Sequence, residues 1–268
     1  MIGIDCHLHT VYSGHGSGSI EEVCRAAEAC GLGTIAFTEH LPLPAEVDPA
    51  CEFSMSADEE ARYRAEIEQA RSAHPSLTIV RGCEADWRPG AAAYIMQHLV
   101  GYDFKLGSVH MLADGYCFDD PACVDGWKTR GADAIWKEYF DLWFDAVSSD
   151  VGFTSMAHPD LVKKFGIFPT FDPTPLYRRA ARLAVEHGVC MEVSTAGLRK
   201  PVGEFYPSRA FLEICRAEGV RFTVGSDAHS PAEVGYRIAD AYDYLISCGI
   251  TAIEVPGVDG SLSACSLV

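Results

Sequence analysis

The stretch SIEEVCRAAEACGLGTIAFTEH, residues 19–40, contains an amphipathic helix followed by a short apolar strand. Ser19 with Glu22 three residues later is typical of a capping box, in which two side chains satisfy the first free N–H groups of a helix. Gly31 stands where a glycine ends a helix, and the apolar run Thr34–Thr38 has the length of a buried strand. The stretch therefore predicts one helix–strand unit, with a glutamate and a histidine at the end of the strand.

The same alternation of helices and apolar runs continues along the 268-residue chain. The predicted strands are Ile2–Cys6, Thr34–Thr38, Leu77–Gly82, Phe104–Ser108, Gly152–Met156, Val189–Val193 and Phe222–Gly225. The predicted helices include Ser19–Cys30, Asp58–Ala73, Ala132–Ser148, Pro175–His187 and Ser208–Glu218. This order predicts parallel strands with right-handed crossovers. We expect one α/β domain over residues 1–268, a distorted (β/α)7 barrel similar to a TIM barrel, with an open doubly wound sheet as the alternative.

Two segments depart from this alternation. Residues 111–131 are long for a connection between a strand and a helix. Their aromatic side chains are Tyr116, Phe118 and Trp127, which argue against disorder. We expect a lid over the site, with a surface loop of no function as the alternative. A further apolar run, Thr251–Val255, is followed by a short polar tail over residues 257–268 with no predicted helix.

Composition excludes several classes of function. A net charge of −17, from 21 basic and 38 acidic residues, argues against a nucleic-acid binder, which needs clustered lysines and arginines. The 11 cysteines are scattered without a C-x-x-C pair, which predicts mostly reduced thiols packed as small apolar side chains. No apolar run approaches the ~18 residues of a membrane span, and Met1 leads directly into the first strand without a signal peptide. We therefore expect a cytoplasmic protein.

Metal-competent side chains lie at or just after the carboxyl ends of the predicted strands. They are His7, His9, His15, His40, Glu84, His110, His158, Asp227 and His229. Active sites of parallel α/β barrels are built at this end, so we expect these side chains to meet. A single buried histidine is more often a hydrogen-bonded core residue than a ligand, but seven in the same topological position favour a metal site. The other three, His74, His98 and His187, fall in predicted helices or at helix ends and are expected to be surface residues without a metal role.

The spacing of the ligands indicates more than one metal ion. His7 and His9 are two apart on a strand and therefore share one face, and Asp227 and His229 repeat this spacing on the last strand. Nine ligands are too many for one ion. Two divalent ions would use six to eight of them, and three ions with about three ligands each, Glu84 bridging two of them, would use all nine. Such a cluster lowers the pKa of a bridging water to about 7 and binds phosphoryl oxygens. This chemistry favours phosphate-ester hydrolysis.

The order of these motifs resembles a known family. H-x-H, T-E-H, G-x-E, S-V-H, A-H-P-D and G-S-D-A-H follow one another as in the polymerase-and-histidinol-phosphatase (PHP) family of metal-dependent phosphoesterases. The resemblance covers about residues 3–245 and is closer to the histidinol-phosphatase branch. The stretches that carry the closer likeness are His158–Gly166, Glu192–Ser208 and Gly107–His110 with Phe118–Pro121.

The resemblance implies a distorted seven-stranded barrel with a trinuclear site of zinc, iron or manganese. It assigns the first metal to His7, His9, Glu84 and Asp227, the second to Glu84, His110 and His158, and the third to His15, His40 and His229. It also implies hydrolysis of L-histidinol phosphate to L-histidinol and phosphate, in histidine biosynthesis, through attack of a metal-bridging hydroxide. Ser194 departs from the asparagine expected in many relatives, at a position assigned to a polar substrate contact.

Basic and acidic residues near the strand ends are candidates for the rest of the chemistry. Arg199 offers a planar fork suited to phosphate, and Lys163 and Lys164 offer further positive charge. Asp160 and His229 are candidates for protonating the leaving alkoxide. Asp160 is alternatively a carboxylate that orients a ligand imidazole.

The acidic and aromatic residues of residues 111–131 are candidates for binding a cationic substrate. Asp119, Asp120 and Trp127 would contact the ammonium and imidazole groups of histidinol phosphate. Glu192 is a candidate for orienting a metal ligand, pairing with Arg199 or binding the substrate amine. The alternatives to this function are hydrolysis of another small phosphate monoester, C–N hydrolysis as in amidohydrolases, and metal binding without catalysis.

Overall fold

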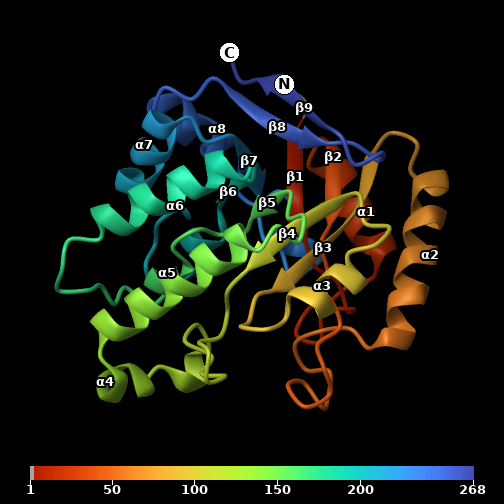
Figure 1. The fold of residues 1–268 in the computed structure, drawn as a ribbon. Coiled ribbons are helices and arrows are strands. Elements are labelled where there is room, and N and C mark those ends of the chain that lie inside the picture. The colour runs from red at the N-terminus through yellow and green to blue at the C-terminus, as the bar shows by residue number, and fades with distance from the viewer. Residues whose placement is uncertain (1–2) are drawn as a thin grey trace.

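A computed structural model describes residues 3–268 and contains a seven-stranded parallel sheet in the order β1 to β7 (Figure 1). The strands are β1 (Gly3–Leu8), β2 (Leu32–Phe37), β3 (Thr78–Asp86), β4 (Phe104–Ser108), β5 (Ser155–Met156), β6 (Cys190–Ser194) and β7 (Phe222–Gly225). A parallel bridge between Leu8 and Ala228 brings the end of β7 back to β1. The predicted α/β barrel of seven strands is therefore confirmed, and Ile2 of the first predicted strand lies outside the described residues.

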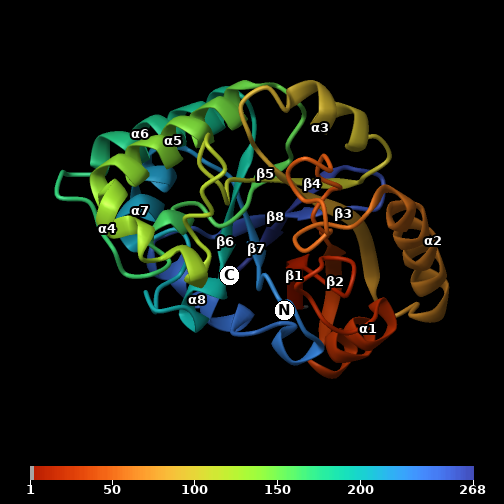
Figure 2. The same cartoon turned by 90° about the horizontal axis from the view of Figure 1, so that it is seen from below.

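Helices surround the strands on all sides in the view along the barrel (Figure 2). They are α1 (Ile20–Ala29), α2 (Ala57–Ala73), α3 (Ala92–His98), α4 (Gly126–Arg130), α5 (Ala132–Ser148), α6 (Thr174–Glu186), α7 (Arg209–Glu218) and α8 (Ile238–Ser247). Short 3-10 turns are η1 (Pro121–Cys123), η2 (Leu161–Lys163), η3 (Ala196–Arg199) and η4 (Pro231–Glu233). The capping box at Ser19 is present, because its side chain accepts from the backbone N–H of Glu22 while the Glu22 carboxylate accepts from that of Ser19.

Large apolar side chains of α5 fill the space between the sheet and the helices beside it. Trp136, Phe140 and Trp143 are fully buried on this helix. Complete burial of a large apolar side chain contributes ~1.5–3 kcal/mol, so this helix is firmly held against the barrel. Helix α4, which ends the predicted lid, packs on α5 and is thereby fixed to the same scaffold.

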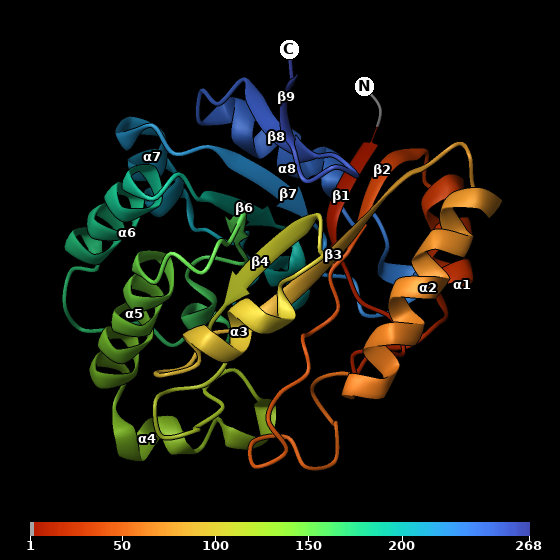
Figure 3. The ribbon, with the colours of Figure 1, turned by 45° about the vertical axis from the view of Figure 1, so that its right-hand side comes forward.

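The long connections after β2 and β4 lie at the end of the barrel opposite the hairpin of β8 (Ala252–Pro256) and β9 (Leu262–Ser266) (Figure 3). Within residues 111–131, Trp127 is buried and its indole N–H donates to the carbonyl oxygen of Phe118 at 2.9 Å. Phe118 is itself fully buried. The segment has a packed interior, in which Trp127 is buried rather than facing a substrate as predicted, and its role as a lid stays a prediction.

The end of the chain forms a hairpin, although the sequence indicated only an apolar run at Thr251–Val255 followed by a short polar tail. Strand β8 (Ala252–Pro256) pairs with β9 (Leu262–Ser266) in an antiparallel hairpin. The turn between them is held by Asp259, whose carboxylate accepts from the backbone N–H of Ser261 at 3.0 Å, and by Gly260 at a φ of +78°. The apolar and polar residues of this segment alternate too weakly to predict a strand. Strand β9 forms through its hydrogen bonds to β8.

The three histidines on helices stand apart from the others. His98 and His187 are half-buried and lie beside Glu60 and Asp150. His74 was expected on the surface but is buried between α1 and α2, where its Nε2 lies 2.8 Å from a Glu21 carboxylate oxygen. The ring of His74 is covered, and its two nitrogens face the carboxylates of Glu21 and Glu28. Its position at the end of a helix does not by itself predict this burial.

The described residues also bear on the cysteines and on membranes. All 11 cysteines are free thiols, and those at positions 6, 24, 83, 190, 215 and 248 are buried. None of the helices between residues 3 and 268 has the length and apolarity needed to cross a membrane. The prediction of reduced, packed thiols is therefore confirmed for these six positions.

Candidate metal centre

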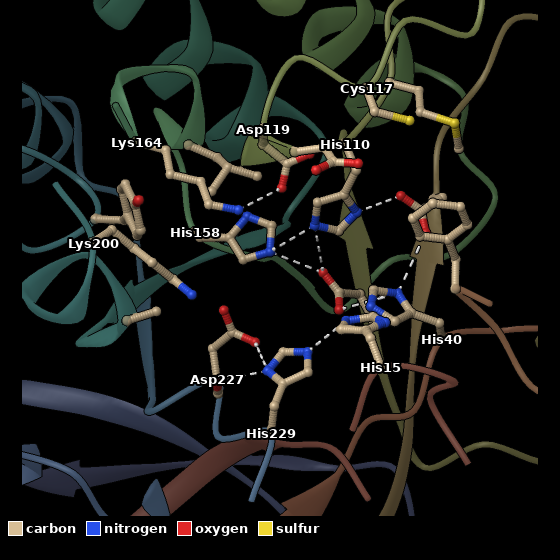
Figure 4. A pocket seen from close by; sticks show the side chains of 18 of the residues that line it. His15, His40, His110, Cys117, Asp119, His158, Lys164, Lys200, Asp227 and His229 are labelled. Atoms are coloured by element: carbon tan, nitrogen blue, oxygen red, sulfur yellow. Dashed lines mark hydrogen bonds and ion pairs between the residues drawn. The ribbon is translucent and has the colours of Figure 1, made fainter. Parts of the chain in front are cut away.

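A cavity of about 480 Å³ lies at the carboxyl ends of the barrel strands (Figure 4). Seven of the predicted ligands line it, namely His15, His40, Glu84, His110, His158, Asp227 and His229. Glu84 reaches this group from β3. His7 and His9 lie fully buried beneath them at the end of β1. The structure thus brings all nine predicted ligands into one region.

Four ligand atoms around His7 and His9 have the spacing of a tetrahedral metal site. The Nε2 atoms of the two histidines are 2.9 Å apart, and they lie 3.2 and 3.3 Å from Oε2 of Glu84. Their distances to Oδ1 of Asp227 are 3.6 and 3.5 Å. Ligands at ~2.0–2.1 Å from a tetrahedral zinc ion would be about 3.3 Å from one another. The geometry therefore fits one divalent ion with four ligands from β1, β3 and the end of β7.

A second group of ligand atoms surrounds the other oxygen of Glu84. Oε1 lies 2.9 Å from Nε2 of His158 and 3.6 Å from Nε2 of His110. The two imidazole nitrogens are 3.3 Å apart. Because each carboxylate oxygen of Glu84 faces a different group, its side chain is placed to bridge two ions.

A third group lies at the rim of the cavity. Nε2 of His15 and Nε2 of His229 are 2.9 Å apart, and His40 lies beside them (Figure 4). Ligand atoms of His9, His40 and His229 also fall within 4.8 Å of one another. The predicted third set has His15 in place of His9, so its exact membership stays a prediction, and Nδ1 of His40 also lies 3.4 Å from Oε2 of Glu84.

The electrostatics of the cluster favour the metal-binding protonation state for Glu84, His9 and His15, but not for every ligand. Burial opposes protonation of His7, His40 and His110, yet nearby carboxylates outweigh it, raising the pKa of His7 and His40 and that of His110 to about 10. Burial opposes ionisation of Glu84, but the positive charges of the surrounding histidines outweigh it and hold its pKa well below its usual range. Burial and the charge of His229 lower the pKa of His9 well below its ordinary value. Burial with two neighbouring histidines lowers the pKa of His15 to about 3. An ionised carboxylate and neutral imidazoles are the forms that bind divalent cations.

Glu192 holds two of the ligands from behind, at the end of β6. Its Oε1 lies 2.8 Å from Nδ1 of His7, and its Oε2 accepts from the backbone N–H of His158 at 2.7 Å. Carboxylates that bond the far nitrogen of a ligand histidine fix the orientation of its ring. Of the three roles predicted for Glu192, the structure places it for this one.

The sequence analysis did not identify two other carboxylates that orient ligand histidines, Asp86 and Glu39. Asp86 contacts Nδ1 of His110 and lies 3.3 Å from Nδ1 of His40. Glu39 accepts from the hydroxyl of Ser13 at 2.6 Å, and that hydroxyl lies 2.9 Å from Nδ1 of His9. Asp86 is two residues after Glu84 on β3, so the period-two pattern of a strand was the signal that could have found it.

The three basic residues predicted to bind phosphate occupy different environments. Nη2 of Arg199 donates to the carbonyl oxygens of Ser226 and Asp227 at 2.9 Å each, so Arg199 supports the loop after β7. Lys163 is fully buried outside the cavity lining, and its ammonium donates to Glu204 at 3.0 Å. Burial in this ion pair corrects the expectation that Lys163 reaches the substrate.

Two lysines do line the cavity. Lys164 faces it and forms an ion pair with Asp119 at 3.1 Å. Lys200 was not singled out from the sequence, yet its ammonium points toward Asp227 and the histidines (Figure 4). Within the residues that the structure describes, Lys200 has no carboxylate partner. It follows Arg199 directly, and only the path of the η3 turn decides which of the two faces the cavity.

Two polar residues near the strand ends are buried away from the lining. Asp160 accepts from the backbone N–H of Ser208 at 2.9 Å and lies 3.4 Å from the ammonium of Lys163. Burial raises the pKa of Asp160 to about 6, but the carboxyl is not among the groups that face the cavity. The hydroxyl of Ser194 accepts from the backbone N–H of Ala196 at 3.2 Å and is also buried. Both therefore support the backbone around the site rather than line it.

A parallel barrel whose strand ends bring seven histidines, a glutamate and an aspartate around one cavity defines a metallohydrolase of the α/β-barrel class. The sequence model of the PHP domain matches residues 5–196, and the chain belongs to the PHP family.

Relatives extend over nearly the whole chain. A protein of Deinococcus radiodurans named probable histidinol-phosphatase is 36% identical over 254 residues, which cover 93% of this chain and 95% of that protein. The histidinol-phosphatase of Bacillus subtilis is 27% identical and covers 87% of this chain and 95% of its own length. The structure of histidinol phosphate phosphatase from Lactococcus lactis subsp. lactis, complexed with zinc, L-histidinol and phosphate, superimposes with a TM-score of 0.80. It is 19% identical, covers 97% of this chain and 98% of that one, and has the same fold.

Proposed function

We propose that this chain is a metal-dependent phosphomonoesterase that hydrolyses L-histidinol phosphate to L-histidinol and phosphate. The observation that carries the proposal is the convergence of nine candidate ligands at one cavity. The same cavity is lined by Lys200, which has no carboxylate partner among residues 3–268. The similarity to histidinol-phosphatases supports the choice of substrate. We place the reaction in histidine biosynthesis in the cytoplasm.

The residues of the cluster fit three divalent ions, and we propose zinc, iron or manganese. His7, His9, Glu84 and Asp227 would hold the first ion, Glu84, His110 and His158 the second, and His15, His40 and His229 the third. Bound ions of this kind supply Lewis acidity and activate water at neutral pH.

The remaining lining residues of the cavity include both basic and acidic side chains. Lys200 faces the ligand cluster and is placed to bind the phosphate dianion, and Lys164 also lines the cavity. His229, beside Asp227, is our candidate for holding the proton that the leaving oxygen receives. Asp119, which pairs with Lys164 at 3.1 Å, and Asp120 also line the cavity, and they are our candidates for binding the ammonium of histidinol phosphate.

The alternative of C–N hydrolysis has no support in the arrangement of ligands. Amidohydrolase sites often bridge two metals with a carboxylated lysine from a middle strand, whereas here the bridging position is taken by Glu84 on β3. Both lysines that line the cavity, Lys164 and Lys200, come from connections after β5 and β6. Another small phosphate monoester therefore stays the nearest alternative substrate.

A panel of phosphate monoesters tests the substrate. We expect kcat/KM for L-histidinol phosphate to exceed that for sugar phosphates, nucleotides and O-phosphoethanolamine by at least about 100-fold, because two polar subsites then act together. Steady-state release of inorganic phosphate measures each rate. A sugar phosphate that wins by tenfold would refute the substrate while leaving the chemistry intact, and no release from any monoester would refute both.

Lys200→Met should lower kcat/KM for L-histidinol phosphate by about 10- to 100-fold, because a charge-assisted contact to phosphate contributes ~1.5–3 kcal/mol. The matched control is Lys128→Met, since Lys128 is an exposed lysine of α4 that pairs with Asp125 away from the cavity lining. Steady-state kinetics of both variants measure the effect. Equal kcat/KM for Lys200→Met and the wild type would show that Lys200 does not contact the phosphate.

A further inference from the structure

Tyr206 lines the same cavity but is used by none of the roles described above. It lies after η3, and its backbone pairs with that of Ser194 at the end of β6. The N–H of Ser194 donates to the carbonyl oxygen of Tyr206 at 2.7 Å, and the reverse hydrogen bond measures 3.1 Å. The side chain is fully buried, and Lys200 and Ala196 are among the residues that line the cavity with it.

The hydroxyl of Tyr206 has no hydrogen-bond partner among residues 3–268. Tyr63 shows the ordinary behaviour of an equally buried tyrosine, because its hydroxyl makes bonds of 3.0 and 2.9 Å to the carbonyl oxygens of Phe37 and Gly82. Buried hydroxyls without a partner are rare, since leaving one unpaired costs free energy. An unpaired hydroxyl in the lining of a functional cavity is therefore best explained by a partner that arrives with the ligand.

Neighbouring residues restrict the position of the Tyr206 ring. A Cβ on Gly197 would lie 3.0 and 3.1 Å from ring atoms of Tyr206, so the ring packs directly on the backbone there. The ring meets that of His158 edge-on, with centroids 6.4 Å apart. The ammonium of Lys163 donates to the carbonyl oxygen of Phe205 at 2.8 Å and fixes the preceding residue. Contacts from three segments thus hold the hydroxyl where it lies.

The chemistry of the cavity selects the kind of ligand. Burial raises the pKa of the Tyr206 hydroxyl well above its ordinary value, so the hydroxyl is protonated and is a hydrogen-bond donor at neutral pH. No carboxylate of the cavity lies within hydrogen-bond distance of it, whereas Lys164, Lys200 and the ligand cluster make the cavity suited to an oxyanion. We propose that Tyr206 contacts the substrate directly, its hydroxyl donating a hydrogen bond to an oxygen of the phosphoryl group. This inference rests on the proposed phosphatase function.

Tyr206→Phe tests it, with Tyr63→Phe as the matched control. We expect Tyr206→Phe to weaken binding of inorganic phosphate to the metal-loaded protein, and to lower kcat/KM by about 10- to 100-fold for L-histidinol phosphate and for phenyl phosphate alike. Its Tm should equal or exceed that of the wild type, because no internal hydrogen bond is lost. Tyr63→Phe should lower Tm and leave kcat/KM and phosphate affinity unchanged. Calorimetric titration, steady-state kinetics and thermal unfolding give the three readings.

Each outcome decides the matter. Unchanged phosphate affinity and kcat/KM in Tyr206→Phe would overturn the proposal, and a fall in Tm without those changes would assign the hydroxyl a structural role instead. A wild-type protein that hydrolyses no phosphate monoester would refute the proposed function. The comparison of phosphate affinities would then still test the contact made by Tyr206.

Discussion

Replacing Glu84 with glutamine should lower phosphatase activity by at least about 10³-fold, the largest effect that we expect from a single substitution in this protein. Oε2 of Glu84 lies 3.2 Å from Nε2 of His7, and Oε1 lies 2.9 Å from Nε2 of His158, so one carboxylate serves two groups of ligands. Glutamine has nearly the same shape but is neutral and offers one oxygen. It can neither bridge two cations nor balance their charge.

The measurements for this variant are kcat/KM for L-histidinol phosphate and metal content by atomic emission. We expect the content to fall by at least about one ion per chain relative to the wild type. Glu213→Gln is the control, because Glu213 lies on α7 and pairs with the exposed Arg209. A Glu84→Gln protein that keeps its full metal content and activity would contradict the bridging position of Glu84.

Exhaustive removal of metal with a chelator should reduce activity to background and lower Tm by roughly 10 °C. A ligand present at 1,000 times its Kd stabilises the folded state by ~4 kcal/mol, and ~1 kcal/mol shifts Tm by 2–4 °C in a domain of nearly this size. Without metal, the folded state must hold ligand nitrogens close together with no cation between them. The Nε2 atoms of His7 and His9 are 2.9 Å apart, and so are those of His15 and His229.

Metal content, Tm and activity should be followed together during chelation and after separate addition of zinc, manganese or ferrous iron. The ion that restores activity best identifies the preferred metal, and we expect two to three equivalents to bind. His187→Ala is a suitable control, because His187 lies beside Asp150 and outside the cluster. Unchanged Tm and activity in protein freed of metal would show that the convergence of histidines has another cause.

The convergence of the nine candidate ligands was predictable because each position depends on local sequence and one topological rule. His7 and His9 share a face of β1 because strand side chains alternate, and parallel barrels gather the carboxyl ends of their strands. The capping box at Ser19 and the glycine at Gly31 were enough to place α1 between two strands. The β8–β9 hairpin was missed because it depends on pairing between two segments with little alternation of their own.

The residues around the ligands were not predictable in the same way. Arg199 and Lys200 are neighbours of like charge, yet one bonds to backbone carbonyl oxygens while the other points into the cavity. Lys163 and Lys164 differ in the same manner, because only Lys164 lines the cavity. In each pair, the path of one 3-10 turn, η2 or η3, decides which side chain faces the cavity. The spacing of residues in the sequence does not determine that path.

The sequence by itself determined the alternation of strands and helices, the barrel class and the nine metal-competent side chains, because these follow from periodicity and from the polarity of parallel strands. Only the tertiary structure decided how those nine are grouped around Glu84, which basic residues face the cavity, and that the hydroxyl of Tyr206 is left without a partner. These features depend on distances between atoms from different strands. Such distances are set by how the turns pack across the end of the barrel, and no single segment of the sequence contains them.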